Sequence, residues 1–202
     1  MIHILICNKP STRFPGKNEL LFDYTYIWLL REARELNEEF CVYTVGKRLN
    51  VTVPRGWCHI DTPCNNHHED IKLAMDAIEA DAFDAYVLPQ LTQPLRRRGL
   101  LIEAVDLMRE YGLPVISASR ETVKDWRKID VMGKWGERGN DASRLMYDGA
   151  LYVWSNDTFS SVFDNTAPHS VIDNADAVVD IDYEDDMPPN LNRMWADLMI
   201  KK

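Results

Sequence analysis

The 202-residue chain lacks several features that mark common classes of protein. None of its apolar runs approaches the ~18 residues that a membrane-spanning helix needs. The longest early run, residues 2–7, contains His3 and lacks a basic segment and a cleavage site, which favours a buried strand over a secretion signal. Repeats, low-complexity tracts and evident linkers are also missing, and 46% of the residues are hydrophobic. We therefore expect a single folded domain over residues 1–202.

Positive charge is scarce, because 23 Lys and Arg residues stand against 32 Asp and Glu residues and leave a net charge of -9. Such an acidic chain is a poor general binder of nucleic acid or of an anionic membrane surface. We therefore expect neither partner. The net charge does not exclude an anionic small molecule that is held by a local group of basic side chains.

Cysteine is rare as well, with four residues: Cys7, Cys41, Cys58 and Cys64. Without an export signal, these cysteines indicate a reduced, cytoplasmic protein rather than a disulfide-bonded one. Cys58, Cys64, His67 and His68 are metal-ligand residue types, but their spacing matches no common zinc motif. We expect buried thiols and two loop histidines there, and no structural zinc.

Short apolar segments alternate with helical patterns along the chain. The expected strands are residues 2–7, 40–45, 57–61, 85–89, 114–118 and 150–154. Apolar residues spaced by three and four mark three intervening helices: Phe22, Tyr26, Leu29, Ala33 and Leu36, then Ile71, Met75 and Ile78, then Leu101, Val105 and Met108. A short helix is expected near residues 157–159 and a terminal one at residues 191–200. This order predicts an α/β fold with a mostly parallel sheet and helices on both faces.

Ligands of such a sheet bind beyond the carboxyl ends of the strands, so the loop at residues 8–18 is the first candidate site. Residues 1–18 contain no Asp or Glu, and Lys9, Arg13 and Lys17 recur at every fourth position. Basic side chains together with exposed backbone N–H groups suit the phosphates of a nucleotide. The glycine spacing of a Walker loop is absent. The alternative is an ordinary polar surface turn.

A second loop, residues 90–98, follows the fourth expected strand and leads into a helix. Its residues Gln90 and Thr92 offer neutral hydrogen-bonding groups, which suit a polyol. Three arginines follow, and for Arg97 and Arg98 a solvated helix start is the better interpretation.

An acidic segment, residues 173–186, contains seven Asp and Glu side chains and no basic residue. Asp180 and Asp182 alternate after two valines, so we expect them on one face of a strand end. Paired carboxylates suit Mg²⁺, a hard ion that prefers oxygen and commonly binds phosphates as well. For residues 184–186 an acidic surface turn is the better interpretation.

Four motifs resemble, in their order and spacing, those of the CMP-sugar synthetases. Residues 11–18 read S-T-R-F-P-G-K-N, similar to the family's CTP-binding signature R-x-x-S-x-R-x-P-x-K-N. Residues 88–96 are similar to the family's L-Q-P-T-S-P-L-R, residues 148–152 to N-G-A-I-Y, and residues 180–182 with Asp186 to D-I-D-T-x-x-D. The chain most closely resembles the acylneuraminate cytidylyltransferases, with CMP-Kdo synthetase as the sister type.

The chain departs from the family's motifs at several positions. Asn8 stands in place of the leading arginine, and Gln93 in place of a serine. Asp148 replaces the usual asparagine, and Met146 stands where an arginine is usual. The family's dimerisation insert corresponds to residues 120–147 and is short in this chain. The resemblance therefore implies an altered sugar pocket beside better preserved phosphate and metal ends.

The resemblance implies a Rossmann-like nucleotide-diphospho-sugar transferase fold and transfer of CMP from CTP to a sugar acid, with release of pyrophosphate. It implies these site residues: Ser11, Arg13, Lys17 and Asn18 for the nucleotide, Asp180 and Asp182 for Mg²⁺, and Gln90, Thr92 and Arg138 for the sugar. Arg13, Lys17 and Asp182 would carry the catalysis, which consists mainly of positioning and charge neutralisation.

Two alternatives to this activity stay open. The departures at Gln93, Met146 and Asp148 fit a nucleotidyltransferase with another acceptor. Asn8 fits a non-catalytic nucleotide-binding protein that kept the fold. In each case the sequence leaves the choice between a monomer and a homodimer open.

We expect CTP to stabilise the chain more than the purine triphosphates do, because residues 11–18 match the family's CTP loop and no Walker sequence is present. Thermal unfolding with each nucleoside triphosphate and Mg²⁺ measures this preference. A ligand at about 100 times its Kd adds ~2.7 kcal/mol to the free energy of unfolding. An equal shift with ATP, or no shift with CTP, would contradict the expectation.

Overall fold

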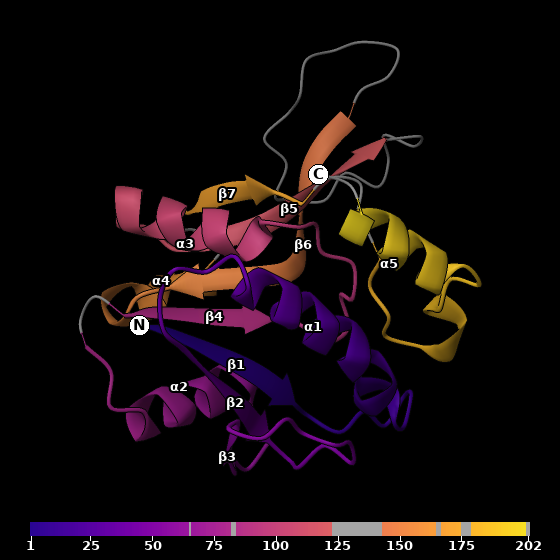
Figure 1. The fold of residues 1–202 in the computed structure, drawn as a ribbon, viewed down its shortest axis with the longest axis horizontal. Coiled ribbons are helices and arrows are strands. Elements are labelled where there is room, and N and C mark those ends of the chain that lie inside the picture. The colour runs from indigo at the N-terminus through magenta and orange to yellow at the C-terminus, as the bar shows by residue number, and fades with distance from the viewer. Residues whose placement is uncertain (65, 82–83, 123–142, 165–166, 175–178, 201–202) are drawn as a thin grey trace.

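Seven strands within the described part of the chain form one sheet (Figure 1). The structure, a computed structural model, describes residues 1–202 except residues 65, 82–83, 123–142, 165–166, 175–178 and 201–202. The strands are β1 (Ile2–Asn8), β2 (Phe40–Gly46), β3 (Cys58–Ile60), β4 (Ala85–Pro89), β5 (Val115–Thr122), β6 (Ser143–Trp154) and β7 (Ser170–Asp173). Their order across the sheet is β3-β2-β1-β4-β6-β5-β7. β6 runs antiparallel to β4 and β5, and the other neighbouring strands are parallel.

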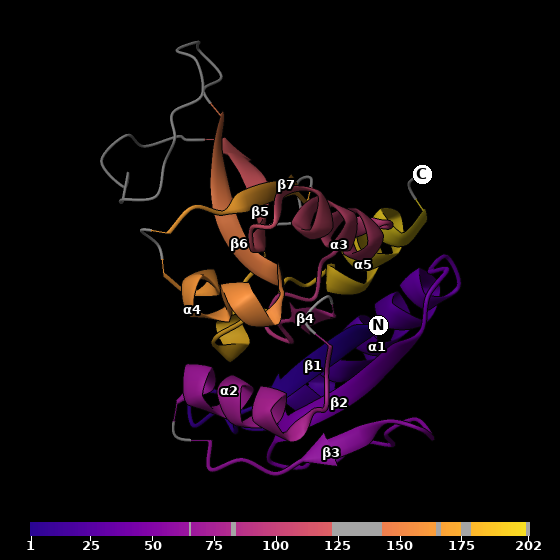
Figure 2. The same ribbon diagram turned by 90° about the vertical axis from the view of Figure 1, so that its left-hand side faces the viewer.

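Helices cover both faces of the sheet, as the sequence predicts. The α-helices are α1 (Lys17–Ala33), α2 (His67–Ala77), α3 (Leu100–Tyr111), α4 (Phe159–Val162) and α5 (Leu191–Ile200). Figure 2 shows α1, α3 and α5 on one side of the sheet and α2 and α4 on the other. No helix among the described residues combines the length and the apolar character needed to cross a membrane.

Each face of the sheet has its own hydrophobic core, built from the predicted helical stripes. Phe22 and Leu29 of α1 pack with Leu101 of α3 against one face. Ile71 and Met75 of α2 pack with the aromatic cluster around α4 against the other. The spacing of three and four residues therefore identified the buried side of each long helix correctly.

The second half of the sheet differs from the sequence prediction. β5 and β6 extend the expected strands into the segment assigned to the dimerisation insert and pair as far as Thr122 and Ser143. The β7 strand, four residues long, was not predicted at all. The remainder of the expected insert, residues 123–142, lies outside the described residues, so the prediction of a short dimerisation insert stays a prediction.

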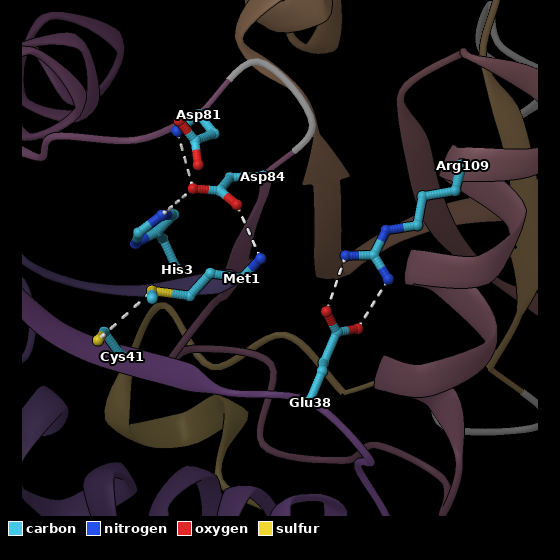
Figure 3. A network of polar contacts seen from close by, with 7 residues as sticks. All are labelled: Met1, His3, Glu38, Cys41, Asp81, Asp84 and Arg109. Atoms are coloured by element: carbon cyan, nitrogen blue, oxygen red, sulfur yellow. Dashed lines mark hydrogen bonds and ion pairs between the residues drawn. The ribbon is translucent and has the colours of Figure 1, made fainter.

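A network of polar contacts holds together the amino-terminal edge of the sheet (Figure 3). The Met1 α-amino group donates to Asp84 Oδ1 at 2.7 Å, and His3 Nε2 lies 3.0 Å from Asp84 Oδ2. Burial opposes ionisation of Asp84, but these hydrogen bonds lower the pKa of its carboxyl to about 2. Beside them, Arg109 donates two hydrogen bonds to Glu38 at 2.7 and 3.0 Å. The network fastens β1 to the start of β4, and α3 to the segment before β2.

Glu32, near the end of α1, is a fully buried acidic residue. Its carboxylate accepts hydrogen bonds from the backbone N–H groups of Gly99 at 2.8 Å and Leu101 at 3.0 Å, at the start of α3. Burial raises the pKa of Glu32 to about 7, although these two hydrogen bonds act in the opposite direction. Glu32 therefore joins α1 to α3 and gives the core a group that titrates near neutral pH.

We expect Glu32→Gln to change how stability depends on pH. The folded chain holds the Glu32 proton more tightly than the unfolded chain, whose ordinary pKa is 4.5. The stabilising contribution is therefore present below about pH 4.5 and is lost as the pH rises to about 7, a change of about 3 kcal/mol. Glu32→Gln cannot titrate, so its stability should not fall with pH in this way. Its amide N–H faces a backbone N–H donor, so the variant should be less stable than wild type at every pH.

Chemical denaturation across this pH range, for wild type and Glu32→Gln, measures the difference. The matched control is Glu110→Gln, which removes an exposed carboxylate from α3 and should keep the wild-type slope. Parallel stability curves for wild type and Glu32→Gln would contradict the assignment of the titration to this residue.

Candidate functional site

A cavity of about 400 Å³ opens at the carboxyl ends of β1 and β4. It is lined by the loop after β1, the first residues of α1, residues 88–92 and one side chain of the acidic segment. The sequence-predicted site residues that line it are Ser11, Arg13, Lys17, Asn18, Gln90, Thr92 and Asp182. Asp180 lies close to the cavity without lining it, and Arg138 lies outside the described residues. One cavity therefore brings together side chains from three parts of the chain.

The loop after β1 is folded back on itself before α1 begins. The backbone N–H of Phe14 donates to Ser11 Oγ at 3.1 Å, and the backbone N–H of Lys17 donates to the Phe14 carbonyl at 3.2 Å. Gly16 has a φ of 78°, in the left-handed region that glycine adopts without strain. This turn places the N-terminus of α1 at the cavity, where its N–H groups favour an anion.

Asn8 stabilises this loop from within the fold. Its side-chain amide donates to the Lys47 carbonyl at 2.8 Å, and its Oδ1 accepts a hydrogen bond from Asn18 at 2.7 Å. Asn18 also donates to the Lys9 carbonyl at 3.1 Å. A Cβ at Gly46 would lie 2.5 Å from the Asn8 carbonyl oxygen, so glycine is required at that close approach. Asn8 is buried, and its side chain is satisfied by Lys47 after β2 and by Asn18 of α1.

Lys17 and Arg13 bind the acidic segment. The Lys17 ammonium, on a side chain with 7% exposure, lies 3.0 Å from Asp182 Oδ1 and donates to the Ile181 carbonyl at 3.0 Å. Arg13 lies 3.6 Å from the other Asp182 oxygen and 5.4 Å from the centre of the Tyr183 ring. One carboxylate therefore lies between two cations, in the place where phosphate oxygens would meet them.

The sequence prediction of a strand end at Asp180 and Asp182 is wrong. Residues 179–182 are irregular, because the Ile181 N–H donates to the Thr92 carbonyl at 2.9 Å rather than to a sheet neighbour. The Ile181 side chain is fully buried between α1 and α5. This anchor still leaves both aspartates near the cavity.

The acidic segment is ordered by Asp186. Asp186 Oδ2 accepts hydrogen bonds from the backbone N–H groups of Asp182 at 2.9 Å and Tyr183 at 2.7 Å. Partial burial raises the pKa of Asp180, and the negative charge of Asp182 adds to this effect, against Lys17 and a hydrogen bond from Thr92. Two carboxylates whose charges oppose each other are a donor set that a dication would stabilise.

No group of three or more His, Cys, Asp and Glu side chains is arranged to hold a metal ion within the described ranges. Mg²⁺ at sites of phosphoryl transfer takes one or two carboxylates and completes its shell with phosphates and water. Asp180 and Asp182 therefore fit Mg²⁺ that arrives with a nucleotide.

The second loop is held in place by Arg96, which is buried with 1% exposure. Its guanidinium donates to the Ala150 carbonyl at 2.8 Å, to Thr25 Oγ1 at 3.0 Å and to the Gln90 carbonyl. It also lies 5.2 Å from the centre of the Trp28 ring. Burial lowers the pKa of Arg96 to about 9, against the attraction of Asp148, so the side chain stays charged at neutral pH. Arg96 thereby positions Gln90 at the cavity.

Asp148 belongs to the same buried network. Its carboxylate accepts hydrogen bonds from Ser117, Ser119 and Asn174, and from the Ala150 N–H at 2.9 Å. Asp148 is therefore satisfied within the fold by β5, β6 and Asn174.

Gln93 and Met146 are the other two positions that depart from the resembled motifs. Gln93 is buried, and its backbone N–H donates to the Gln90 carbonyl at 3.2 Å. The side chain of Met146 lies outside the described part of the structure.

The arginines at the start of α3 form surface ion pairs. Arg97 donates two hydrogen bonds to Glu103 at 2.9 and 2.5 Å, and Arg98 pairs with Glu35. Both arginines are partly exposed just before α3, where a solvated helix start was expected.

The cavity also contains Cys7 and His67, which sequence reasoning did not place there. The expectation of buried thiols and two loop histidines is wrong. Cys58 is exposed and Cys64 is half-buried, and His67 and His68 are the first residues of α2. The sequence did hold one signal for placing the histidines at the cavity. Both follow β3, and the carboxyl ends of parallel strands meet at the edge of the sheet where ligands bind. Burial raises the pKa of the Cys7 thiol far above its usual range, which leaves it unreactive.

No family model matches the sequence, and no curated protein sequence matches it significantly. Solved structures share its fold. The CMP:2-keto-3-deoxy-manno-octonic acid synthetase complexed with CTP is 15% identical with a TM-score of 0.60, and the match covers 97% of this chain and 96% of that one. The inositol-1-phosphate CTP transferase from T. maritima is 14% identical with a TM-score of 0.56, over 98% and 95% of the two chains.

A third similar structure, 4-diphosphocytidyl-2C-methyl-D-erythritol synthase from Anaerococcus prevotii DSM 20548, is 10% identical with a TM-score of 0.56, over 92% and 94% of the two chains. At these identities the likeness concerns the fold alone. It confirms the expected nucleotide-diphospho-sugar transferase fold, including the mostly parallel sheet.

We expect the cavity to bind inorganic tripolyphosphate through its cations. Arg13→Ala removes an exposed guanidinium without disturbing the core and should weaken binding roughly tenfold, the value of a hydrogen bond to a charged group. Isothermal titration calorimetry measures the affinity. The matched control is Arg34→Ala at the far end of α1, which is also exposed and should bind like wild type. Equal loss in both variants would indicate a general charge effect instead of a site.

Proposed function

We propose that the chain is a cytidylyltransferase that transfers CMP from CTP to a sugar acid and releases pyrophosphate. The observation that carries the proposal is the convergence of Arg13, Lys17 and Asp182 at one cavity beyond the sheet's carboxyl edge. The fold shared with structures described as CTP-using enzymes supports the choice of nucleotide. The acceptors named for those enzymes differ from one another. The choice of a sugar acid as acceptor therefore rests on the sequence resemblance.

In this reaction, an acceptor hydroxyl oxygen forms a bond to the α-phosphorus of CTP. The bond from that phosphorus to the oxygen bridging to the β-phosphate breaks, and pyrophosphate leaves with the electron pair. The acceptor's proton passes to solvent. Arg13 and Lys17 bind the triphosphate and neutralise charge on the departing pyrophosphate, while the loop at residues 11–18 orients the nucleotide.

Asp180 and Asp182 would hold Mg²⁺, which neutralises charge at the α-phosphate when bound. The arrival of the triphosphate gives Lys17 and Arg13 new anionic partners. Asp182 is then released from those cations, and its carboxylate becomes available as a ligand. Asp186 keeps the backbone of Asp182 in place during this exchange through two N–H contacts.

The acceptor side of the cavity is built from Gln90 and Thr92. Their amide and hydroxyl groups suit the hydroxyls of a sugar, and Arg96 fixes the loop that carries them. Arg138, which lies outside the described residues, stays a prediction for the sugar carboxylate.

The non-catalytic alternative is kept as the second candidate. It rests on Asn8 in place of an arginine, since the Asn8 side chain is held by Lys47 and Asn18 and brings no cation to the cavity. A working enzyme is the proposal to test first. Pyrophosphate release from each of the four nucleoside triphosphates, with Mg²⁺ and a panel of sugar acids, tests it. Binding of CTP without release on any acceptor would favour the non-catalytic protein.

We expect Asp182→Asn to lower turnover about a hundred- to thousandfold, the loss that follows removal of one group that stabilises transition-state charge. CTP affinity should persist, because Arg13 and Lys17 remain and no longer have a competing carboxylate. The measurement is pyrophosphate release over a Mg²⁺ series, together with the Kd for CTP.

The matched control is Asp185→Asn, which changes an exposed carboxylate three residues away and should leave turnover nearly unchanged. Asp180→Asn should follow Asp182→Asn. Wild-type activity in Asp182→Asn would exclude its metal role.

A further inference from the structure

His67 is a half-buried polar side chain of the cavity that the proposed chemistry does not use. It opens α2 and lines the cavity. Its Nε2 atom is buried and makes no hydrogen bond to any described residue. A buried ring nitrogen without a partner is costly to the fold, so its presence at the wall of a cavity indicates a partner supplied by a ligand.

The backbone that carries His67 is held by hydrogen bonds on both sides. The Asn66 side chain caps the helix by accepting from the His68 N–H at 3.0 Å. Asp70 Oδ1 accepts from the Cys64 N–H at 3.0 Å, which fastens the preceding loop to α2. The ring itself packs in a T-shaped contact with Phe163, with ring centres 6.2 Å apart. The start of α2 is therefore in place before any ligand arrives, which lowers the entropic cost of binding.

The position of His67 separates it from Lys17. Lys17 begins α1 on one face of the sheet, whereas His67 begins α2 on the other face (Figure 2). Cys7 and Leu88, which also line the cavity, belong to the apolar core on the α2 side. The cavity thus has the ion pair of Lys17 with Asp182 on one side and, beside Lys9, apolar walls and one buried nitrogen on the other. A nucleotide has the same polarity, with charged phosphates and a flat base whose edge forms hydrogen bonds.

We propose that His67 recognises the base of the bound nucleoside triphosphate, with Nε2 hydrogen-bonded to the edge of the pyrimidine ring. This inference rests on the proposed function and names the residue that selects its nucleotide. Burial lowers the pKa of His67, with Lys9 and His68 acting in the same direction and Asp70 against them, so the ring is neutral at pH 7. A neutral imidazole carries one N–H and can satisfy the base without adding charge.

The experiment compares His67→Phe with His68→Phe, titrating each with CTP and with inorganic tripolyphosphate. His67→Phe keeps an aromatic ring against Phe163 and removes the nitrogen. His68 is the matched control, because its exposed ring stacks on Phe159 with centres 4.7 Å apart and does not line the cavity. We expect His67→Phe to weaken CTP binding about tenfold and to leave tripolyphosphate binding unchanged, since one hydrogen bond to a neutral base is lost. His68→Phe should bind both ligands like wild type.

CTP binding to folded His67→Phe at wild-type strength would overturn the inference, as would equal weakening for CTP and tripolyphosphate. If His67→Phe does not fold, His67→Gln replaces it. Its amide can still bond to the base, so it should retain CTP selectivity over ATP, whereas His67→Ala should lose it. Failure of the proposed function gives a different result, because wild type would then bind CTP without releasing pyrophosphate on any acceptor, or would not bind CTP at all.

Discussion

The contact between Lys17 and Asp182 is the interaction on which the candidate site depends. It joins the start of α1 to a segment 165 positions later, and the same ammonium donates to the Ile181 carbonyl. Since Lys17 is buried, its charge needs an anionic partner in the folded chain. Asp182 supplies one, and a phosphate is the chemical substitute for it. The cationic end of the cavity therefore exists because two distant segments meet at one ammonium group.

The rest of the fold holds these two segments at the right distance. Arg96 connects the second loop to β6 and α1 from a fully buried position, and Asp148 joins β5 to β6 within the same network. On the other side of the cavity, Asn8 ties the ends of β1 and β2 to the first loop. Asn8 and Asp148 depart from the resembled family's motifs, and both have structural partners. Both side chains are therefore satisfied within the fold.

Local patterns predicted the fold's first half well and its second half less well. β4 matches the expected residues 85–89, because a short apolar run between polar loops is typical of a buried strand. The four-residue β7 and the polar start of β6 carry no such run, and they are formed by pairing with β5 across the chain. At the site, the basic loop was visible in the sequence, whereas His67 was not. A lone histidine acquires meaning only when the fold buries its nitrogen at a cavity.

A crystal structure of the chain with CTP and Mg²⁺ tests the central claim most directly. The account predicts that the triphosphate lies between Arg13 and Lys17, that Asp182 has exchanged Lys17 for the metal ion, and that the base lies beside His67. Nucleotide bound elsewhere, or bound in the cavity with the contact between Lys17 and Asp182 unbroken, would contradict it.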